Sequence, residues 1–162
     1  MATKKSAYYS AALPCVLGAI CADASDDVVN ALKTFGEKIG LAFQIQDDLL
    51  NLVENETSKK QKDFRSDISE GKRTLVVCKA LDLCDENQKQ CMVEILKEKT
   101  KDENKLSTAV DIMQDCGAIL YAQEFAKKLS VEAKGEIESL LDNSLWKDLL
   151  LDMANWAVER GY

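Results

Sequence analysis

The sequence predicts an all-α fold, and three observations support that prediction. Proline occurs once and glycine seven times in 162 residues, so turn-forming residues are scarce. Alanine, leucine, lysine and glutamate dominate the composition, and all four favour helices. Apolar residues recur at helical spacing, as in Ile112, Ile119 and Ala126, and no segment alternates as a strand would. We therefore expect one helical domain over residues 1–162.

The first two helices are expected over residues 3–22 and 26–54. Pro14 predicts a kink in the first helix, because proline removes a backbone donor. Ser25 is the expected N-cap of the second helix, since a serine side chain satisfies free N–H groups at a helix start. The stretch 54–73 is too polar for a core, and we expect it to form a long functional loop.

The second half of the chain carries further helix signals. A third helix is expected from Thr74 to Leu83. Asp85, with Gln88 three residues later, forms a capping-box pattern for a fourth helix. Later helices are expected over 106–128, 131–142 and 145–160, with Ser107, Ser130 and Asn143 as their caps.

Composition excludes several classes of function. The formal charge is −7 and the pI is about 4.7, so no basic surface is available to bind nucleic acid. Histidine is absent, which excludes histidine-based acid–base catalysis and the usual zinc sites. No two of the six cysteines form a C-x-x-C pair, and we expect reduced core thiols in a cytoplasmic protein. No signal peptide or membrane span is expected, because the most apolar run is too short.

A polar stripe on the expected second helix points toward a function. Gln44, Asp47, Asp48 and Asn51 recur at spacings of three and four residues, which places them on one face. A solvated helix face is the simpler interpretation. Against it, the stripe holds no lysine or arginine, and adjacent carboxylates repel unless a cation lies beside them. Mg²⁺ would remove this repulsion, because it binds carboxylates together with substrate phosphates.

Lysines that could bind phosphate flank the stripe along the sequence. The polar stretch after it supplies Lys62, Arg65, Lys72 and Arg73, and Lys4 and Lys5 lie near the N-terminus. Each lysine taken alone is most simply an exposed side chain. Together with the carboxylates, the cation-rich polar stretch and the upstream lysines indicate a Mg²⁺-dependent diphosphate site.

Three stretches resemble motifs of the trans-isoprenyl diphosphate synthases, the polyprenyl synthetase family that includes farnesyl and geranylgeranyl diphosphate synthases. "KSAYYSAALP" resembles the family's Lys-Thr segment, with Ser6 in place of threonine. "FGEKIGLAFQIQDDLLN" resembles the region of the second aspartate-rich motif, and "KDFRSDISEGKRT" resembles the loop that follows it. The C-terminal "LLLDMANWAVER" is similar to the family's final helix. The resemblance covers nearly the whole chain and is to the C-terminal half of such an enzyme.

This resemblance implies the C-terminal portion of the isoprenoid synthase helical fold. It also implies Mg²⁺ as cofactor, and condensation of an allylic diphosphate with isopentenyl diphosphate. By resemblance, Asp47, Asp48 and Asn51 are the metal ligands. Lys5 and Lys72 are the catalytic lysines, which stabilise charge on the departing diphosphate. The substrate-binding residues implied are Lys5, Gln44, Lys62, Lys72 and Asp67.

The chain departs from the family's pattern in three places. Asn51 stands where the family usually has a third aspartate, which is expected to weaken metal binding. Gln61 and Arg65 replace glycines that are common in the loop, so the loop's path is expected to differ. The first aspartate-rich motif is absent, and with it the half that normally carries the isopentenyl diphosphate site.

Two forms of the enzyme fit these departures. The chain is either a truncated form of a longer synthase or a subunit whose partner supplies the missing N-terminal half. The alternative outside enzymes is a non-catalytic helical interaction or regulatory subunit of the same family, and a terpene cyclase is a weaker enzymatic alternative. Helices without their usual neighbours would expose apolar surface, so we also expect a homo-oligomer.

Overall fold

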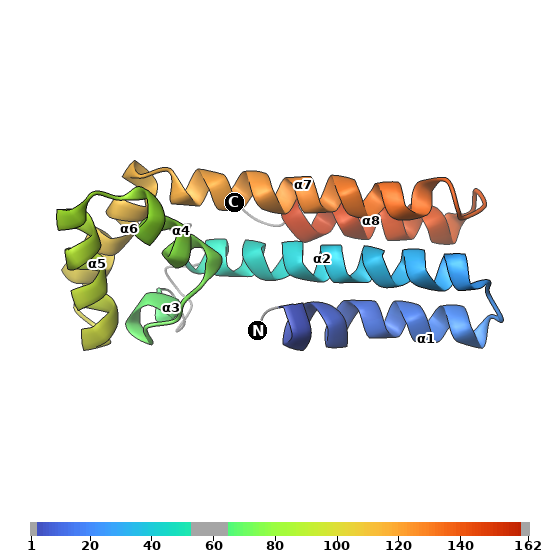
Figure 1. Cartoon of the computed structure of the whole chain (residues 1–162), viewed down its shortest axis with the longest axis horizontal. Helices are drawn as coiled ribbons and strands as arrows, with labels where there is room; N and C mark the ends of the chain where they lie inside the picture. The colour runs from blue at the N-terminus through green and yellow to red at the C-terminus, as the bar shows by residue number, and fades with distance from the viewer. Residues whose placement is uncertain (1–2, 53–64, 160–162) are drawn as a thin grey trace. The chain divides into compact units, whose positions relative to one another are not determined.

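The structure is a computed structural model that describes residues 3–52 and 65–159. Every regular element in these two ranges is a helix, which confirms the predicted all-α fold. In chain order the elements are η1 (Thr3–Ala12), α1 (Leu13–Cys21), α2 (Asp26–Leu52), α3 (Ser66–Ser69), α4 (Leu75–Leu83), α5 (Glu86–Glu98), α6 (Glu103–Asp115), α7 (Ala118–Glu138) and α8 (Leu145–Glu159) (Figure 1). None of these helices combines the length and the apolar character needed to cross a membrane.

The chain divides into two compact units. One is formed by Met1–Gln46 and Phe125–Gly161, and the other is centred on Asp47–Glu124. Helices α2 and α7 each contribute residues to both units. The single domain expected over 1–162 stays a prediction.

The first unit is built around an apolar core that α2, α7 and α8 share. Its buried members are Phe35, Ile39, Ala133, Ile137 and Ala154. Ala11 of η1 and Cys15 of α1 pack against this core. In Figure 1 the blue segment of η1 and α1 runs alongside α2. Each of the four segments therefore turns an apolar face inward, as amphipathic helices do.

Two glycines let η1 approach α2 closely. A Cβ atom built on Gly36 would lie 2.5 Å from the Cα of Ala12. One built on Gly40 would lie 2.6 Å from the Cα of Ala7. Both are closer than real Cβ atoms come to backbone, so only glycine fits at these two positions of α2 without moving η1.

The expected helix over 3–22 is present, but it is not uniform. Residues Thr3–Ala12 form a π-helix, and α-helix continues from Leu13 to Cys21. Pro14 lies in the first turn of the α-helical part. Proline there lacks a backbone donor and crowds the preceding turn, so the change of helix type next to it has a physical cause.

All six cysteines are free thiols, as the sequence predicts. Cys15 lies against the core of the first unit, and burial raises the pKa of its thiol. A raised pKa keeps the thiol protonated at neutral pH, which makes it a poor nucleophile. Cys21 and Cys78 are exposed, so they differ from the expectation of core thiols.

In the second unit, α3 and α4 both pack on α5 and α6. Two of its helix starts were predicted correctly. The N–H of Val77 donates to the Thr74 side chain (3.3 Å), which caps α4. Asp85 and Gln88 form the predicted capping box at the start of α5. The short helix α3 was not predicted, because most residues of the stretch around it are polar.

The predicted boundary between helices 106–128 and 131–142 was wrong. The chain breaks instead at Gly117, whose φ of 79° is the left-handed conformation that ends many helices. Ser130 is buried inside α7, where its hydroxyl donates to the carbonyl of Ala154 in α8 (2.6 Å). The preceding helix α6 is capped by Asp102, and Ser107 lies within it.

The predicted cap of the last helix was off by one residue. Ser144 precedes α8, and its hydroxyl accepts from the N–H of Lys147 (3.2 Å). The side-chain oxygen of Asn143 instead accepts from the ammonium group of Lys147 (3.2 Å). Both residues are common caps, and only the direction of the chain entering α8 distinguishes them.

Candidate functional site

The predicted polar stripe lies at the end of α2, where the helix is amphipathic. Asp47 is exposed and Asp48 is half-buried, whereas Leu49 and Leu52 on the other side are fully buried. Among the described residues, no three or more Asp, Glu, Cys or His side chains gather where they could share a metal ion. At this end of α2, the carboxylates that could meet a cation are the adjacent pair Asp47 and Asp48.

Asn51, the last member of the stripe, is bonded to the segment that begins α3. Its side-chain NH₂ donates to the hydroxyl of Ser66 (3.1 Å), and its side-chain oxygen accepts from the N–H of Asp67 (3.1 Å). Its backbone carbonyl accepts from the N–H of Arg65 (2.9 Å). One residue of α2 thus bonds three consecutive residues of the predicted loop.

Asp67 and Lys72, both predicted to contact substrate, form an ion pair. The ammonium group of Lys72 lies 2.7 Å from one carboxylate oxygen of Asp67 and 3.1 Å from Glu70. Asp67 is 8% exposed, whereas Lys72 is exposed. The hydrogen bond to Asp67, followed by the one to Glu70, raises the pKa of Lys72 to about 12. Lys72 therefore stays cationic throughout the neutral range, as a phosphate-binding lysine must.

Arg65 occupies a conformation that usually belongs to glycine. Its φ is 56°, in the left-handed region, so this substitution keeps a glycine-like backbone at the position. The guanidinium group donates to the hydroxyl of Ser107 (2.7 Å) and lies 3.7 Å from Glu103. These contacts with α6 offset the strain of a left-handed non-glycine residue, which is of the order of 1 kcal/mol.

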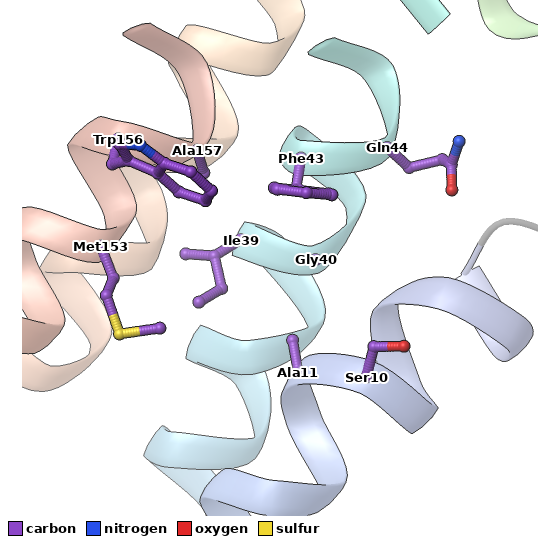
Figure 2. Close-up of a pocket in the computed structure, with 9 residues that line it drawn as sticks. All are labelled: Ser10, Ala11, Ile39, Gly40, Phe43, Gln44, Met153, Trp156 and Ala157. Atoms are coloured by element: carbon purple, nitrogen blue, oxygen red, sulfur yellow. The ribbon is translucent and has the colours of Figure 1, made fainter. Parts of the chain in front are cut away.

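Gln44 lines a groove in the first unit. Figure 2 shows Phe43, Ile39, Met153 and Trp156 around this space, with Gln44 at its edge. The groove has a volume of about 350 Å³. The rings of Phe43 and Trp156 lie 5.7 Å apart at an angle of 33°. Its walls are mainly apolar, so it suits a hydrocarbon group better than a phosphate.

The described structure brings only some of the predicted site residues together. Asn51, Asp67 and Lys72 form one bonded chain in the second unit. Lys62 lies outside the described residues, and for Lys5 the backbone is described within η1 but the side chain is not. Ser66 was missed, although its hydroxyl holds Asn51. A serine directly before the predicted Asp67 was a signal that could have identified it.

Comparisons with known proteins give a consistent result. A profile of the polyprenyl synthetase family matches residues 1–113. The geranylgeranyl diphosphate synthase of Sulfolobus acidocaldarius is 36% identical over 146 residues, which are 90% of this chain and 42% of that protein. The crystal structure of geranylgeranyl pyrophosphate synthetase from Pyrococcus horikoshii Ot3 superposes with a TM-score of 0.88 and 29% identity, over 99% of this chain and 48% of that one.

A third comparison adds a bound ligand. The geranylgeranyl pyrophosphate synthase from Corynebacterium glutamicum, solved with isoprenyl diphosphate and magnesium, matches with a TM-score of 0.88 and 25% identity. The match covers 97% of this chain and 44% of that one. The chain thus spans less than half the length of each of these three proteins.

Proposed function

Because the chain belongs to the polyprenyl synthetase family, we propose that it is the C-terminal half of a magnesium-dependent isoprenyl diphosphate synthase. The reaction proposed is condensation of an allylic diphosphate with isopentenyl diphosphate. The allylic carbon–oxygen bond breaks, diphosphate leaves, the isopentenyl double bond attacks the allylic carbon, and a proton is lost. The observation that carries this proposal is the carboxylate pair on α2 together with the Asp67–Lys72 ion pair, within one compact unit.

The residues present fit a magnesium ion by their chemistry. Asp47 and Asp48 are hard oxygen donors, and Mg²⁺ typically uses one or two carboxylates and completes its shell with water and substrate phosphates. When bound, Mg²⁺ would act as a Lewis acid that stabilises charge on the departing diphosphate. The donor set is too small to hold a metal tightly without the phosphates, so we propose that metal and diphosphate bind together.

The remaining predicted residues would bind and orient the allylic diphosphate. Lys5, Lys62 and Lys72 are proposed to neutralise phosphate oxygens, and Gln44 to donate a hydrogen bond near them. Asp67 is proposed to act through Lys72 and not to bind the diphosphate itself. By accepting from Lys72 at 2.7 Å, it keeps that ammonium group in one position and so lowers the entropy lost on binding.

The second substrate and a second metal-binding motif would come from the rest of the family fold. One face of α8 supports this part of the proposal. Trp146, Leu149, Met153 and Trp156 follow helical spacing of three and four residues, and all four side chains are exposed; we call this the α8 face. Because the chain spans less than half of its relatives, we propose that the N-terminal half of the fold covers this face, on the same polypeptide or on a partner subunit.

Calorimetry with inorganic diphosphate tests the proposed site in this chain. We expect weak binding that requires Mg²⁺, and Asp47→Ala should reduce it below detection while leaving the free energy of unfolding nearly unchanged. Asp111→Ala, at another exposed aspartate, is the matched control and should bind as the unmodified chain does. Diphosphate binding that ignores Mg²⁺, or none at all, would contradict the proposal and favour a non-catalytic helical subunit.

A radiolabel assay tests the division of the enzyme into halves. With both prenyl diphosphates and Mg²⁺, the 162-residue chain should form no condensation product, because it offers groups for one diphosphate only. Addition of an N-terminal half from a homologous synthase should restore turnover. Rapid condensation by the chain alone would show that a second substrate site exists within it.

A further inference from the structure

Asn51 forms hydrogen bonds between α2 and the start of α3, and both helices carry predicted site residues. Asp47 and Asp48 lie one turn before Asn51 in α2. Asp67 lies in α3, within the polar stretch and 16 residues after Asn51 in the sequence. Asn51 is therefore placed where a single side chain can set the distance between the carboxylate pair and the segment that holds Lys72.

The amide group of Asn51 has both of its ends occupied by that segment. An amide offers an acceptor at its oxygen and donors at its nitrogen. The oxygen accepts from the N–H of Asp67 at 3.1 Å, and the nitrogen donates to Ser66 at 3.1 Å. A leucine of similar size could make neither bond, and two polar groups of the segment would lose their partner.

The start of α3 depends on this outside partner. The first N–H groups of a helix have no acceptor within the helix, and a side chain at the N-cap usually supplies one. Here the N-cap residue is Arg65, and it makes no side-chain cap. Asn51 supplies the missing acceptor from α2, at the N–H of Asp67.

Asp67, which Asn51 holds, is in turn bonded to Lys72. The carboxylate of Asp67 accepts from the ammonium group of Lys72 at 2.7 Å, and the Asp67 carbonyl accepts from the Lys72 N–H at 2.8 Å. Both bonds hold Lys72 to the residue that Asn51 holds. The chain of contacts runs without a gap from α2 to the lysine.

We propose that Asn51 is a positioning residue: its amide clamps the segment carrying Asp67 and Lys72 to the turn of α2 that carries Asp47 and Asp48. This role replaces that of a metal ligand, and it rests on the proposed function, since the position of Lys72 matters only if it binds diphosphate. The clamp itself is a property of the ligand-free chain. Its presence and its effect on binding can therefore be measured separately.

Amide hydrogen exchange of the ligand-free chain tests the clamp. In Asn51→Leu, exchange at the N–H of Asp67 should accelerate by about tenfold, the factor expected for loss of one hydrogen bond. Asn51→Asp should restore protection, because a carboxylate accepts from Asp67 and from the Ser66 hydroxyl. Asn87→Leu, at an exposed asparagine of α5, is the matched control and should leave this exchange rate unchanged. Unchanged exchange in Asn51→Leu would overturn the proposal.

Calorimetry with inorganic diphosphate and Mg²⁺ tests the effect on binding. Ser66→Ala and Asn51→Leu should each weaken binding, roughly three- to tenfold, and the double variant should be no weaker than Asn51→Leu, since both act through one contact. A metal ligand would behave differently. If Ser66→Ala bound normally while Asn51→Leu lost binding, Asn51 would be a ligand and the positioning role would be wrong.

The two proposals fail in different ways. If the unmodified chain binds no diphosphate with Mg²⁺, the proposed function is wrong, and with it the effect of the clamp on binding. If the unmodified chain binds but the Asn51 and Ser66 variants bind equally well, only the positioning role is wrong. Ser66→Ala removes a single hydroxyl, so it can test the positioning role even if Asn51→Leu does not fold.

Discussion

Lys147 illustrates how one buried side chain joins two helices of the first unit. It is 8% exposed, and its ammonium group donates to the carbonyls of Glu138 (2.6 Å) and Leu141 (2.9 Å). Glu138 is the last residue of α7. The final carbonyls of a helix lack partners within it and carry partial negative charge, so a cation there is favourable.

Replacing Lys147 with methionine should destabilise the chain. Methionine fills similar space but donates no hydrogen bond, so the carbonyls of Glu138 and Leu141 would lose their bonds to Lys147. We expect a loss of about 2–3 kcal/mol in the free energy of unfolding, measured by urea denaturation. Lys127→Met, at an exposed lysine of α7, is the control and should change it by less than about 0.5 kcal/mol. Equal effects of the two substitutions would contradict this role for Lys147.

Lys72 makes the stability of the chain depend on pH. Its pKa is raised from 10.5 to about 12 in the folded chain, chiefly by the hydrogen bond to Asp67. A raised folded-state pKa stabilises fully below the unfolded value, and that stabilisation is lost as pH rises through the folded value. The stability difference between the unmodified chain and Lys72→Met should therefore be constant up to about pH 9.5 and shrink toward pH 12.

Urea denaturation at a series of pH values measures this dependence. Asp67→Asn is the matched background, because it removes the main cause of the raised pKa. In that background, the effect of Lys72→Met should vary much less with pH. A stability difference that grew above pH 10.5 would have the wrong sign and would contradict the ion pair.

At the scale of elements, the close approach of η1 to α2 limits which residues fit at the contacting positions of α2. At Gly36 and Gly40, an added methyl group would meet backbone atoms of Ala12 and Ala7, which cannot move without the whole helix. The two glycines cost α2 helix propensity, about 1 kcal/mol each relative to alanine. Close packing of the two helices offsets that cost.

Gly36→Ala should destabilise the chain although alanine is the better helix former. Overlap with η1 should outweigh the propensity gain and lower the free energy of unfolding by about 1–3 kcal/mol in urea denaturation. Gly135→Ala is the matched control in α7, where nothing lies within 4 Å, and it should stabilise by up to about 1 kcal/mol. Stabilisation by both substitutions would mean that η1 does not pack as described.

At the scale of the whole molecule, the α8 face is an extended apolar surface that water reaches. Trp146 is 72% exposed and Trp156 57% exposed, although both are among the most costly side chains to leave in water. Clustered exposed apolar residues of this kind mark association surfaces. In the complete fold we propose that the N-terminal half covers them.

Without that half, the chain should associate with itself through the α8 face. Sedimentation velocity should show a mass that rises with concentration. Trp146→Gln combined with Leu149→Gln should shift the chain toward monomer, because it removes apolar area from the interface. Val131→Gln, at an exposed valine of α7, is the control and should not shift the chain toward monomer. A monomer at every concentration would contradict this prediction.

The sequence by itself determined the features that depend on neighbouring residues. Helical periodicity predicted an all-α fold, and the capping box at Asp85 located a helix start to the residue. The family motifs are short and continuous, so the order of residues alone was enough to indicate the polyprenyl synthetase family. These features are local, because a helix and its caps are made by residues within four positions of one another.

Only the tertiary structure decided what distant residues do. Ser130 looked like a helix cap and instead bonds Ala154, 24 residues away. Asn51 is predicted as a metal ligand, which stays a prediction, and the structure shows its side chain bonded to Ser66 and Asp67 within the polar stretch. A serine or asparagine can make either kind of bond, because its donor and acceptor suit a cap, a metal or another segment equally. Which bond such a side chain makes depends on the groups that folding brings within about 3 Å of it. Neighbouring residues in the sequence do not indicate which groups these are.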